Sequence, residues 1–286
     1  MKRKYKIVID SGCSLNKNLV DSLGLVEIPS VFTLNGIRYH DYHDNRELSS
    51  NNFYKHYIAG EKLQITAPSA QDFYDKFEQL IVDGYDIFYI ASSSKILNNF
   101  SNAHAAIAKL LLEHGDANIV LYDSKRFSVA LNLLVRYATK YVKEASPNIN
   151  ELEDALNHMV CKIKYYFISS SNIHHFKNKL WHKFNDLDAL RIGYISENGE
   201  YIFLKKCLGW NNAIKQIFKS FEKECLNPTA FACSHNNNSF SADIALNMLK
   251  KRYPNCREIS LITTRPTIAS FFTGPTLAIG MICCDL

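Results

Sequence analysis

Glycine is scarce in this sequence, at 11 of 286 residues, and none of it has the spacing of a phosphate-binding loop. Neither G-x-G-x-x-G nor G-x-x-x-x-G-K-[ST] occurs. Because those glycines let the backbone approach a phosphate closely, nucleotide binding by these two routes is unsupported. The G-x-S-x-G turn that exposes a serine nucleophile is also absent, and no partner base is identifiable for the serines.

Long apolar runs and basic clusters are missing as well. No segment approaches the roughly 20 apolar residues of a membrane span, and the apolar part of the N-terminal MKRKYKIVID is too short for a signal peptide. The formal charge is +5, with both signs scattered along the chain. This gives no electrostatic footprint for nucleic acid. We expect a soluble cytoplasmic protein with no nucleic-acid partner.

No C-x-x-C pair occurs among the eight cysteines, and only Cys283 and Cys284 are adjacent. Neighbouring cysteines rarely form a disulfide, and the other six are solitary in the sequence. We interpret the cysteines as small core residues of a reduced protein, which agrees with a cytoplasmic location.

What the chain does contain, in its first half, is short apolar runs that alternate with segments of helical period. They predict strands at 5–9, 86–92 and 118–122, and helices at 14–24, 70–83, 99–113 and 126–145. Ser69 to Asp72 has capping-box spacing, and Asn35-Gly36 between two alternating runs indicates a hairpin. Repeated βα units favour a parallel sheet with covering helices.

Ser146-Pro147-Asn148 interrupts the pattern and is the best candidate domain boundary. Beyond it we predict helices at 149–163, 173–185, 210–225 and 239–253, and strands at 164–168, 229–234, 258–262 and 277–284, with two more strands around Asn198-Gly199. The predicted fold is α/β with two lobes: 1–147 has a mainly parallel sheet, and 148–286 has a mixed sheet. A ligand cleft or tunnel is expected between them.

VIDSGCSL, residues 8 to 15, resembles the active-site loop of an aspartic protease. That chemistry needs two carboxylates that share a proton, each on a β-loop, and the chain has no second D-[ST]-G in an apolar setting. We therefore interpret Asp10 and Ser11 as the carboxyl end of the first parallel strand. Open α/β folds collect their ligand-binding groups at such strand ends.

Ser92-Ser93-Ser94 and Asp123-Ser124-Lys125 end two further strands at the same predicted sheet edge. A small-molecule transferase or hydrolase that uses Asp10, Ser94 and Asp123 is one hypothesis for this edge. The histidines and carboxylates of Tyr39 to Asp44, and His174, His175 and His182, have some features of metal ligands. We interpret the first group as a solvated loop and the second as surface or groove-lining residues, so no metal site is predicted.

The ordered set of motifs resembles the DegV family of bacterial fatty-acid-binding proteins over nearly the whole chain. The matching residues are Asp10-Ser11, Gly36 to Tyr39, Thr66 to Ser69, Ser93-Ser94, Asp123 to Lys125 and Thr273 to Pro275. The resemblance implies two α/β lobes around an apolar tunnel that holds one acyl chain. It also implies a carboxylate held near the sheet edge of the N-terminal lobe, and for some members a fatty acid kinase partner.

By this resemblance the ligand is a long-chain, palmitate-like fatty acid, no other cofactor is expected, and the protein is not an enzyme. Transient contact with a membrane surface is compatible with such a ligand. The implied ligand-binding residues are Thr66, Ser93, Ser94, Asp10, Ser11 and Phe272, with Phe127, Phe167 and Phe271 as further candidates for the tunnel lining. Burying a methylene contributes about 0.8 kcal/mol, so an acyl chain of about sixteen carbons could contribute on the order of 10 kcal/mol.

The sequence departs from the family pattern where the arginine and histidine of kinase-coupled members stand. Those positions read Lys179 to His182 and Phe272 to Thr276 here, and Lys95 to Asn99 replaces a glycine-rich turn. Lys95, His182 and Arg191 are the cations that could compensate. A diverged module that has lost ligand binding is therefore a third hypothesis, beside fatty-acid binding and the transferase or hydrolase.

Overall fold

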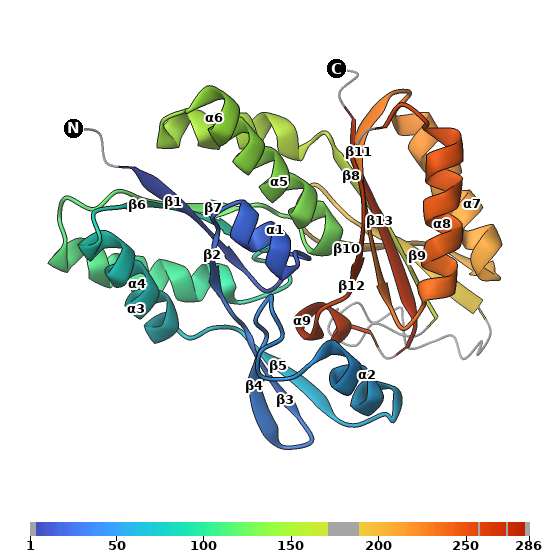
Figure 1. Cartoon of the computed structure of the whole chain (residues 1–286), viewed down its shortest axis with the longest axis horizontal. Coiled ribbons are helices and arrows are strands. Elements are labelled where there is room, and N and C mark those ends of the chain that lie inside the picture. Colours follow the sequence, from blue (N-terminus) through green and yellow to red (C-terminus); the bar gives the residue numbers. More distant parts are fainter. Residues whose placement is uncertain (1–3, 171–188, 257, 273, 284–286) are drawn as a thin grey trace.

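The structure, a computed structural model, describes residues 4–170, 189–256, 258–272 and 274–283. The chain forms two α/β lobes that lie side by side (Figure 1). The described strands form a four-stranded parallel sheet and a three-stranded antiparallel sheet in the first half, and a six-stranded mixed sheet in the second half. The predicted fold class is confirmed. The predicted helix near 173–185 lies outside the described residues.

The parallel sheet of the first half has the strand order β2-β1-β6-β7. Its strands are β1 (Tyr5–Asp10), β2 (Val26–Ile28), β6 (Asp86–Ala91) and β7 (Ile119–Asp123). The helices packed on it are α1 (Lys17–Ser22), α3 (Ala70–Val82), α4 (Asn99–Glu113) and α5 (Ser128–Ala145). α3 and α4 cover one face, and α1 and α5 cover the other. Ser69 forms the predicted capping box with Asp72.

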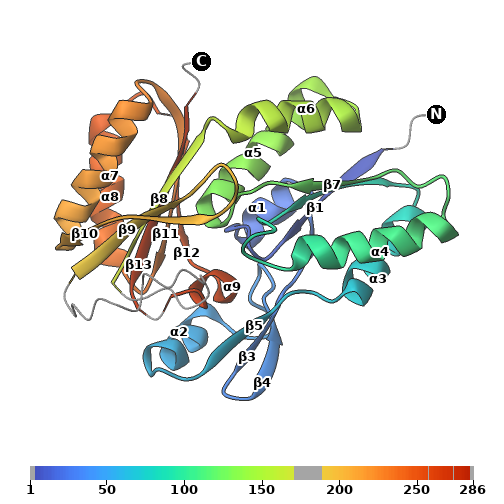
Figure 2. The same cartoon turned by 180° about the vertical axis from the view of Figure 1, so that it is seen from behind.

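The hairpin at Asn35-Gly36 belongs to a separate small sheet in the order β4-β3-β5. Its strands are β3 (Val31–Leu34), β4 (Ile37–His40) and β5 (Leu63–Thr66), and α2 (Ser50–Ile58) packs on it. Asn35 and Gly36 both have positive φ, at 51° and 86°, as a tight two-residue hairpin turn requires. α2 lies next to α9 (Pro266–Ala269) of the second half in both views (Figures 1 and 2).

The sheet of the second half has the order β10-β9-β8-β13-β11-β12 and is antiparallel except for the β11–β12 pair. Its strands are β8 (Ile163–Ser169), β9 (Ala189–Ile195), β10 (Tyr201–Leu208), β11 (Pro228–Asn236), β12 (Glu258–Thr263) and β13 (Thr276–Cys283). The helices are α6 (Ile149–Val160), α7 (Trp210–Glu224), α8 (Ser239–Arg252) and α9 (Pro266–Ala269).

α5 lies between the two large sheets and joins the lobes. Its buried residues share one apolar cluster with Ile9 of β1, Tyr165 of β8 and Ala278 of β13. α7 and α8 cover the opposite face of the six-stranded sheet. The face of that sheet toward α5 is therefore the inter-lobe face. The boundary predicted at residues 147 and 148, between α5 and α6, stays a prediction.

The interpretation of all cysteines as unpaired core residues is wrong for two of them. Cys225, at the end of α7, forms a disulfide with Cys283 at the end of β13. The two residues are 58 positions apart, so neither was identifiable from local spacing. Five other cysteines are free thiols, as predicted: Cys13, Cys207 and Cys233 are buried, but Cys161 is exposed and Cys256 is half-buried, so these two are not core residues. The cytoplasmic location, which rested on unpaired cysteines, stays a prediction.

Candidate functional site

Asp10 lies at the carboxyl end of β1, as predicted, and is completely buried. Its Oδ1 accepts hydrogen bonds from the Gly12 N–H at 2.8 Å and from the Ser92 hydroxyl. Its Oδ2 accepts from the Tyr89 hydroxyl at 2.7 Å and from the Ser92 N–H at 2.9 Å. Burial, with the charge of Asp10 next, raises the pKa of Tyr89, so Tyr89 remains a donor. Asp10 therefore ties β1 to β6.

Gly12 lies where a side chain would collide with the Asp10 network. A Cβ at this position would lie 2.0 Å from the Ser92 Oγ and 3.0 Å from Oδ1 of Asp10. A side chain would displace the hydroxyl that the carboxylate binds. In this chain glycine is therefore required for the close packing of the Asp10 hydrogen-bond network.

Ser11 is also buried, and its hydroxyl is used within the fold. It donates to the Asp41 carbonyl at 2.9 Å and accepts from the Ser30 N–H at 2.9 Å. Asp41 in turn accepts from the Thr267 N–H at 2.9 Å, which links this edge to α9 of the second lobe. Ser11 thus supports a contact between the lobes.

The interpretation of residues 39–44 as a solvated loop is wrong for Asp41 and His43. Asp41 is 2% exposed, and its Oδ1 accepts from Nε of the buried Arg265 at 3.2 Å. Arg265 also donates to Glu27 Oε1 at 2.6 Å, and the His43 ring contacts Glu27 Oε2 at 2.6 Å. These loop residues are buried because their partners come from three other segments of the chain, around Ser11, Glu27 and Arg265.

Burial and ion pairing act in opposite directions on the two carboxyl groups of this network. Burial raises the pKa of Asp41, and the opposing charge of Arg265 does not cancel it. For Glu27 burial also favours the neutral acid, but Arg265 and the His43 hydrogen bonds outweigh burial and lower the pKa. Glu27 is therefore the stronger anionic partner of Arg265.

Ser93 and Ser94 follow β6 and differ in their surroundings. The buried Ser93 hydroxyl donates to the Gly199 carbonyl of the β9–β10 turn at 2.9 Å, across the lobe junction. The Ser94 hydroxyl is at the surface and donates to Asp123 Oδ2 at 2.6 Å. Asp123 and Ser94 thus form one pair, and Asp10 and Ser92 another. The predicted strand-end residues gather at one edge, but they do not form a single catalytic cluster.

Arg126 is a buried cation at the same junction that the sequence did not single out. Its guanidinium donates to three backbone carbonyls, those of Lys125 at 3.0 Å, Val160 at 2.8 Å and Ser196 at 3.3 Å. Burial lowers its pKa. Because these carbonyls come from both lobes, Arg126 joins α6 and the β9–β10 turn to the N-terminal sheet.

Phe127, Phe167, Phe271 and Phe272, the candidate lining residues, all lie in the apolar cluster between the lobes. Phe127 packs edge-on against Phe271 at 5.1 Å between ring centroids, and Phe167 against Phe272 at 5.7 Å. Ile65 of β5 packs against the same cluster. The next residue, Thr66, is exposed, and because side chains alternate along a strand it points to the opposite face of β5 from Ile65.

A cavity of about 700 Å³ lies elsewhere, beside the second half of α5. Tyr137, Tyr141, Met159, Tyr253 and Ile282 are among its lining residues, and none of the six predicted ligand-binding residues lines it. The predicted residues and this cavity are therefore separate features of the molecule.

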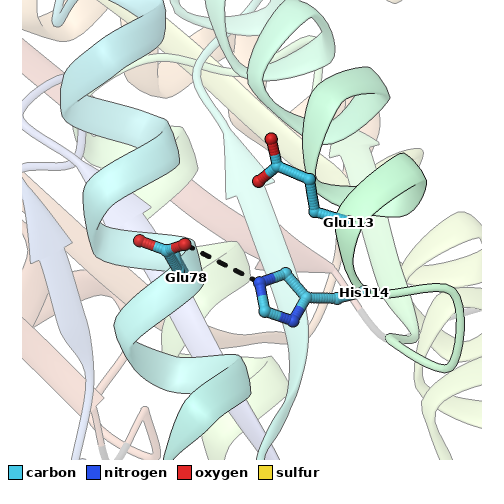
Figure 3. Close-up of side chains that lie close together, drawn as sticks. All are labelled: Glu78, Glu113 and His114. Atoms are coloured by element: carbon cyan, nitrogen blue, oxygen red, sulfur yellow. Dashed lines mark ion pairs between the residues drawn. The ribbon is translucent and has the colours of Figure 1, made fainter.

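Glu78, Glu113 and His114 form the one group in the described residues with the spacing of metal ligands. They lie between α3 and α4, where His114 Nε2 is 3.7 Å from Glu78 Oε1 (Figure 3). The Tyr74 hydroxyl donates to both carboxylates, and Glu113 with Glu78 raises the pKa of Tyr74. These hydrogen bonds already use one oxygen of each carboxylate.

The described residues define a two-lobed α/β protein whose lobes meet on buried aromatic rings and on polar strand ends. Residues 4–178 match the family model described as "Uncharacterised protein, DegV family", and the chain belongs to the DegV family. A DegV domain-containing protein of Clostridium perfringens is 24% identical over 307 residues, which cover 96% of this chain and 99% of that protein. No described helix has the length and apolarity to cross a membrane.

Two solved structures share the fold over nearly the whole chain. The Streptococcus pneumoniae fatty acid kinase B3 protein, loaded with linoleic acid, has a TM-score of 0.82 and 19% identity, covering 98% of this chain and 99% of its own. A stearic acid-binding protein of Eubacterium ventriosum has a TM-score of 0.84 and 15% identity, covering 98% of both chains. At these identities the likeness establishes the fold.

Proposed function

We propose that this protein binds one long-chain fatty acid between its lobes and acts as a carrier without catalysis of its own. The observation that carries the proposal is the aromatic cluster of Phe127, Phe167, Phe271 and Phe272 at the lobe junction. It lies in a fold shared with proteins solved with linoleic or stearic acid. Apolar side chains from both lobes suit an acyl chain, because burial of its methylenes provides the driving force.

The arrangement of polar groups supports a carrier over a transferase or hydrolase. A nucleophile needs a base within hydrogen-bond reach that is itself oriented by a third group. Ser94 has only the half-buried carboxylate of Asp123, and the carboxylate of Asp10 is occupied by four donors. These groups hold the strand ends of the N-terminal sheet together, which leaves the apolar cluster as the feature suited to a ligand.

We further propose that a fatty acid kinase acts on the bound ligand. The support is the structural likeness to the S. pneumoniae kinase B3 protein. Such a partner must reach the carboxylate, so the head group must lie near the protein surface. Thr66, an exposed hydroxyl at the end of β5, is our candidate for that contact in the N-terminal half.

The binding proposal is tested by lipid extraction and by thermal unfolding. Protein purified from a bacterial host should release a fatty acid that mass spectrometry identifies, and palmitate should raise the unfolding temperature of delipidated protein. Phe272→Ala should reduce that shift, whereas Phe240→Ala, which removes a ring that is 77% exposed on α8, should not. Delipidated wild-type protein that shows neither retention nor a shift would refute the proposal.

A further inference from the structure

Residues 264–272, which contain α9 and are here called the α9 segment, belong to the second half of the chain but are held by the first half. α9 lies next to α2 in Figure 1. From α2, the Tyr54 hydroxyl donates to the Thr264 carbonyl and the Tyr57 hydroxyl donates to the Phe272 carbonyl, each at 2.5 Å. Phe272 also belongs to the aromatic cluster. The position of the α9 segment therefore affects how this cluster is covered.

A buried ionic group fastens the start of the α9 segment to the N-terminal lobe. Arg265 donates from Nε to Asp41 Oδ1 at 3.2 Å and from Nη1 to Glu27 Oε1 at 2.6 Å. The three side chains are 5%, 1% and 3% exposed. We call these residues, together with His43, the clasp. Because two buried carboxylates face one guanidinium, the clasp has one negative charge in excess unless a proton neutralises it.

Neither carboxylate of the clasp is well placed to hold that proton. Asp41 accepts an N–H at both oxygens, from Arg265 at Oδ1 and from Thr267 at Oδ2, the latter at 2.9 Å. Glu27 likewise accepts from Arg265 at Oε1 and from the His43 backbone N–H at Oε2, at 2.9 Å. A buried charge without a partner is costly. The balancing proton is therefore expected on a neighbouring group.

The ring of His43 has the geometry of an imidazolium. Its Nδ1 is 2.6 Å from Glu27 Oε2, and its Nε2 faces Asp21 Oδ1 of α1 at 3.8 Å. A neutral imidazole has one nitrogen without a proton, which would here point at a carboxylate, whereas an imidazolium presents an N–H at both nitrogens. The side chain is 11% exposed. The geometry thus places a protonated ring beside the excess negative charge.

Four other titratable side chains face the clasp from neighbouring elements: Cys13, Tyr54, Asp21 and Asp44. Burial raises the pKa of the Cys13 thiol and of the Tyr54 hydroxyl well above their usual values, so both stay neutral. The two aspartates already have exposed cationic partners, Lys17 at 2.6 Å and Arg46 at 2.9 Å. Among the described residues of this region, histidine is the type whose charge ordinarily changes near neutral pH.

We propose that the proton on His43 completes the clasp, and that its loss as the pH rises loosens the α9 segment from the N-terminal lobe. The sign follows from the favoured state. The protonated ring pairs with Glu27 only in the folded protein, so its contribution is present at lower pH and is lost as the pH rises. At the acid end the clasp fails when Glu27 is protonated, and the pKa of Glu27 is lowered from 4.5. The clasp needs no ligand and is a property beyond the proposed function.

Hydrogen–deuterium exchange of ligand-free protein, read by mass spectrometry, tests the clasp. The N–H groups of residues 267–272 all donate within the fold, so their exchange reports opening of the α9 segment. At pH 6, His43→Gln should exchange these groups about tenfold faster than the wild type. At pH 8.5, where the wild-type ring is neutral, the two rates should agree within about threefold. Comparison of two proteins at one pH cancels the intrinsic pH dependence of exchange.

His40→Gln is the matched control. The His40 ring also contacts a carboxylate, that of Glu47 at 2.9 Å, but it is 47% exposed and lies outside the clasp. This variant should exchange like the wild type at both pH values.

Three results overturn the proposal. In the first, His43→Gln exchanges like the wild type at pH 6. In the second, its excess is the same at both pH values, so that the ring acts by shape alone, and in the third His40→Gln has an equal effect. Should His43→Gln not fold, long-range 1H–15N spectra of the wild type at pH 7 are expected to show both His43 ring nitrogens protonated, and a neutral ring overturns the proposal. None of these measurements uses a fatty acid, so they stand apart from the test of fatty-acid binding.

Discussion

Replacement of Asp10 by asparagine tests whether this carboxylate is a structural acceptor. Each of its oxygens accepts one backbone N–H, from Gly12 at Oδ1 and from Ser92 at Oδ2. An asparagine amide has one oxygen and one NH2 group, so in either orientation the NH2 faces a backbone N–H. The Tyr89 hydroxyl can turn to accept a hydrogen bond, but a backbone N–H cannot.

The expected cost follows from the hydrogen bonds that are lost. A hydrogen bond to a charged group contributes about 1.5–3 kcal/mol, and a buried donor left without a partner costs about 1–3 kcal/mol. These terms overlap, because both describe the same N–H group. We therefore expect Asp10→Asn to lower the free energy of unfolding by about 3 kcal/mol.

Urea unfolding followed by circular dichroism measures this loss, and Asp123→Asn is the matched control. Asp123 receives both backbone N–H groups, from Ser94 and Lys125, at Oδ1, and only the Ser94 hydroxyl at Oδ2. Asparagine can keep all three contacts if that hydroxyl turns, so this variant should lose less than about 1 kcal/mol. Equal losses in the two variants, or a loss below about 1 kcal/mol for Asp10→Asn, would refute the reasoning.

Three further predictions concern packing, pH and the disulfide. Gly12→Ala should lower the free energy of unfolding in urea by about 1–3 kcal/mol, because the added Cβ would lie 2.0 Å from a hydroxyl oxygen. Gly115→Ala, whose Cβ would have no atom within 4 Å, should be near neutral. Similar losses in the two variants would contradict this. The pKa of Glu27 is lowered from 4.5, so its ion pair stabilises the fold above pH 4.5. The loss of unfolding free energy caused by Glu27→Gln should therefore shrink as the pH falls below 4.5. A loss that does not depend on pH would contradict this. Peptide mapping without reductant should recover Cys225 joined to Cys283, and reduction should cost about 4 kcal/mol for a loop of 58 residues; recovery of two free thiols would contradict the pairing.

The positions of the strand ends were predictable, but their partners were not. A parallel sheet brings the ends of β1, β6 and β7 to one edge, so the position of Asp10 and Ser94 at the same edge followed from βα alternation. Two of the residues that donate to Asp10, Tyr89 and Ser92, lie 79 and 82 residues away, and strand register determines that they reach it. The apolar period of a strand determines which face of the sheet a side chain occupies. The register between two strands determines which residue lies beside it.

The loop at 39–44 shows the limit of local reasoning more clearly. Histidines and carboxylates after a hairpin strand are usually solvated, and His40 is indeed exposed. Asp41 is buried because Arg265 lies beside it, 224 residues further along the chain. A single sequence carries no signal for such a pairing. Arg191 is an intermediate case, since the strand was predicted but its register with Ser169 was not.

The aromatic cluster serves lobe association as well as the proposed ligand. Its rings contact one another at centroid distances of 4.8–5.7 Å, so an acyl chain must replace ring–ring contacts with ring–chain contacts. Each aromatic pair contributes about 0.5–1.5 kcal/mol beyond its buried area. Transfer of a sixteen-carbon chain from water would contribute on the order of 10 kcal/mol. The net gain in binding free energy is therefore smaller than this value.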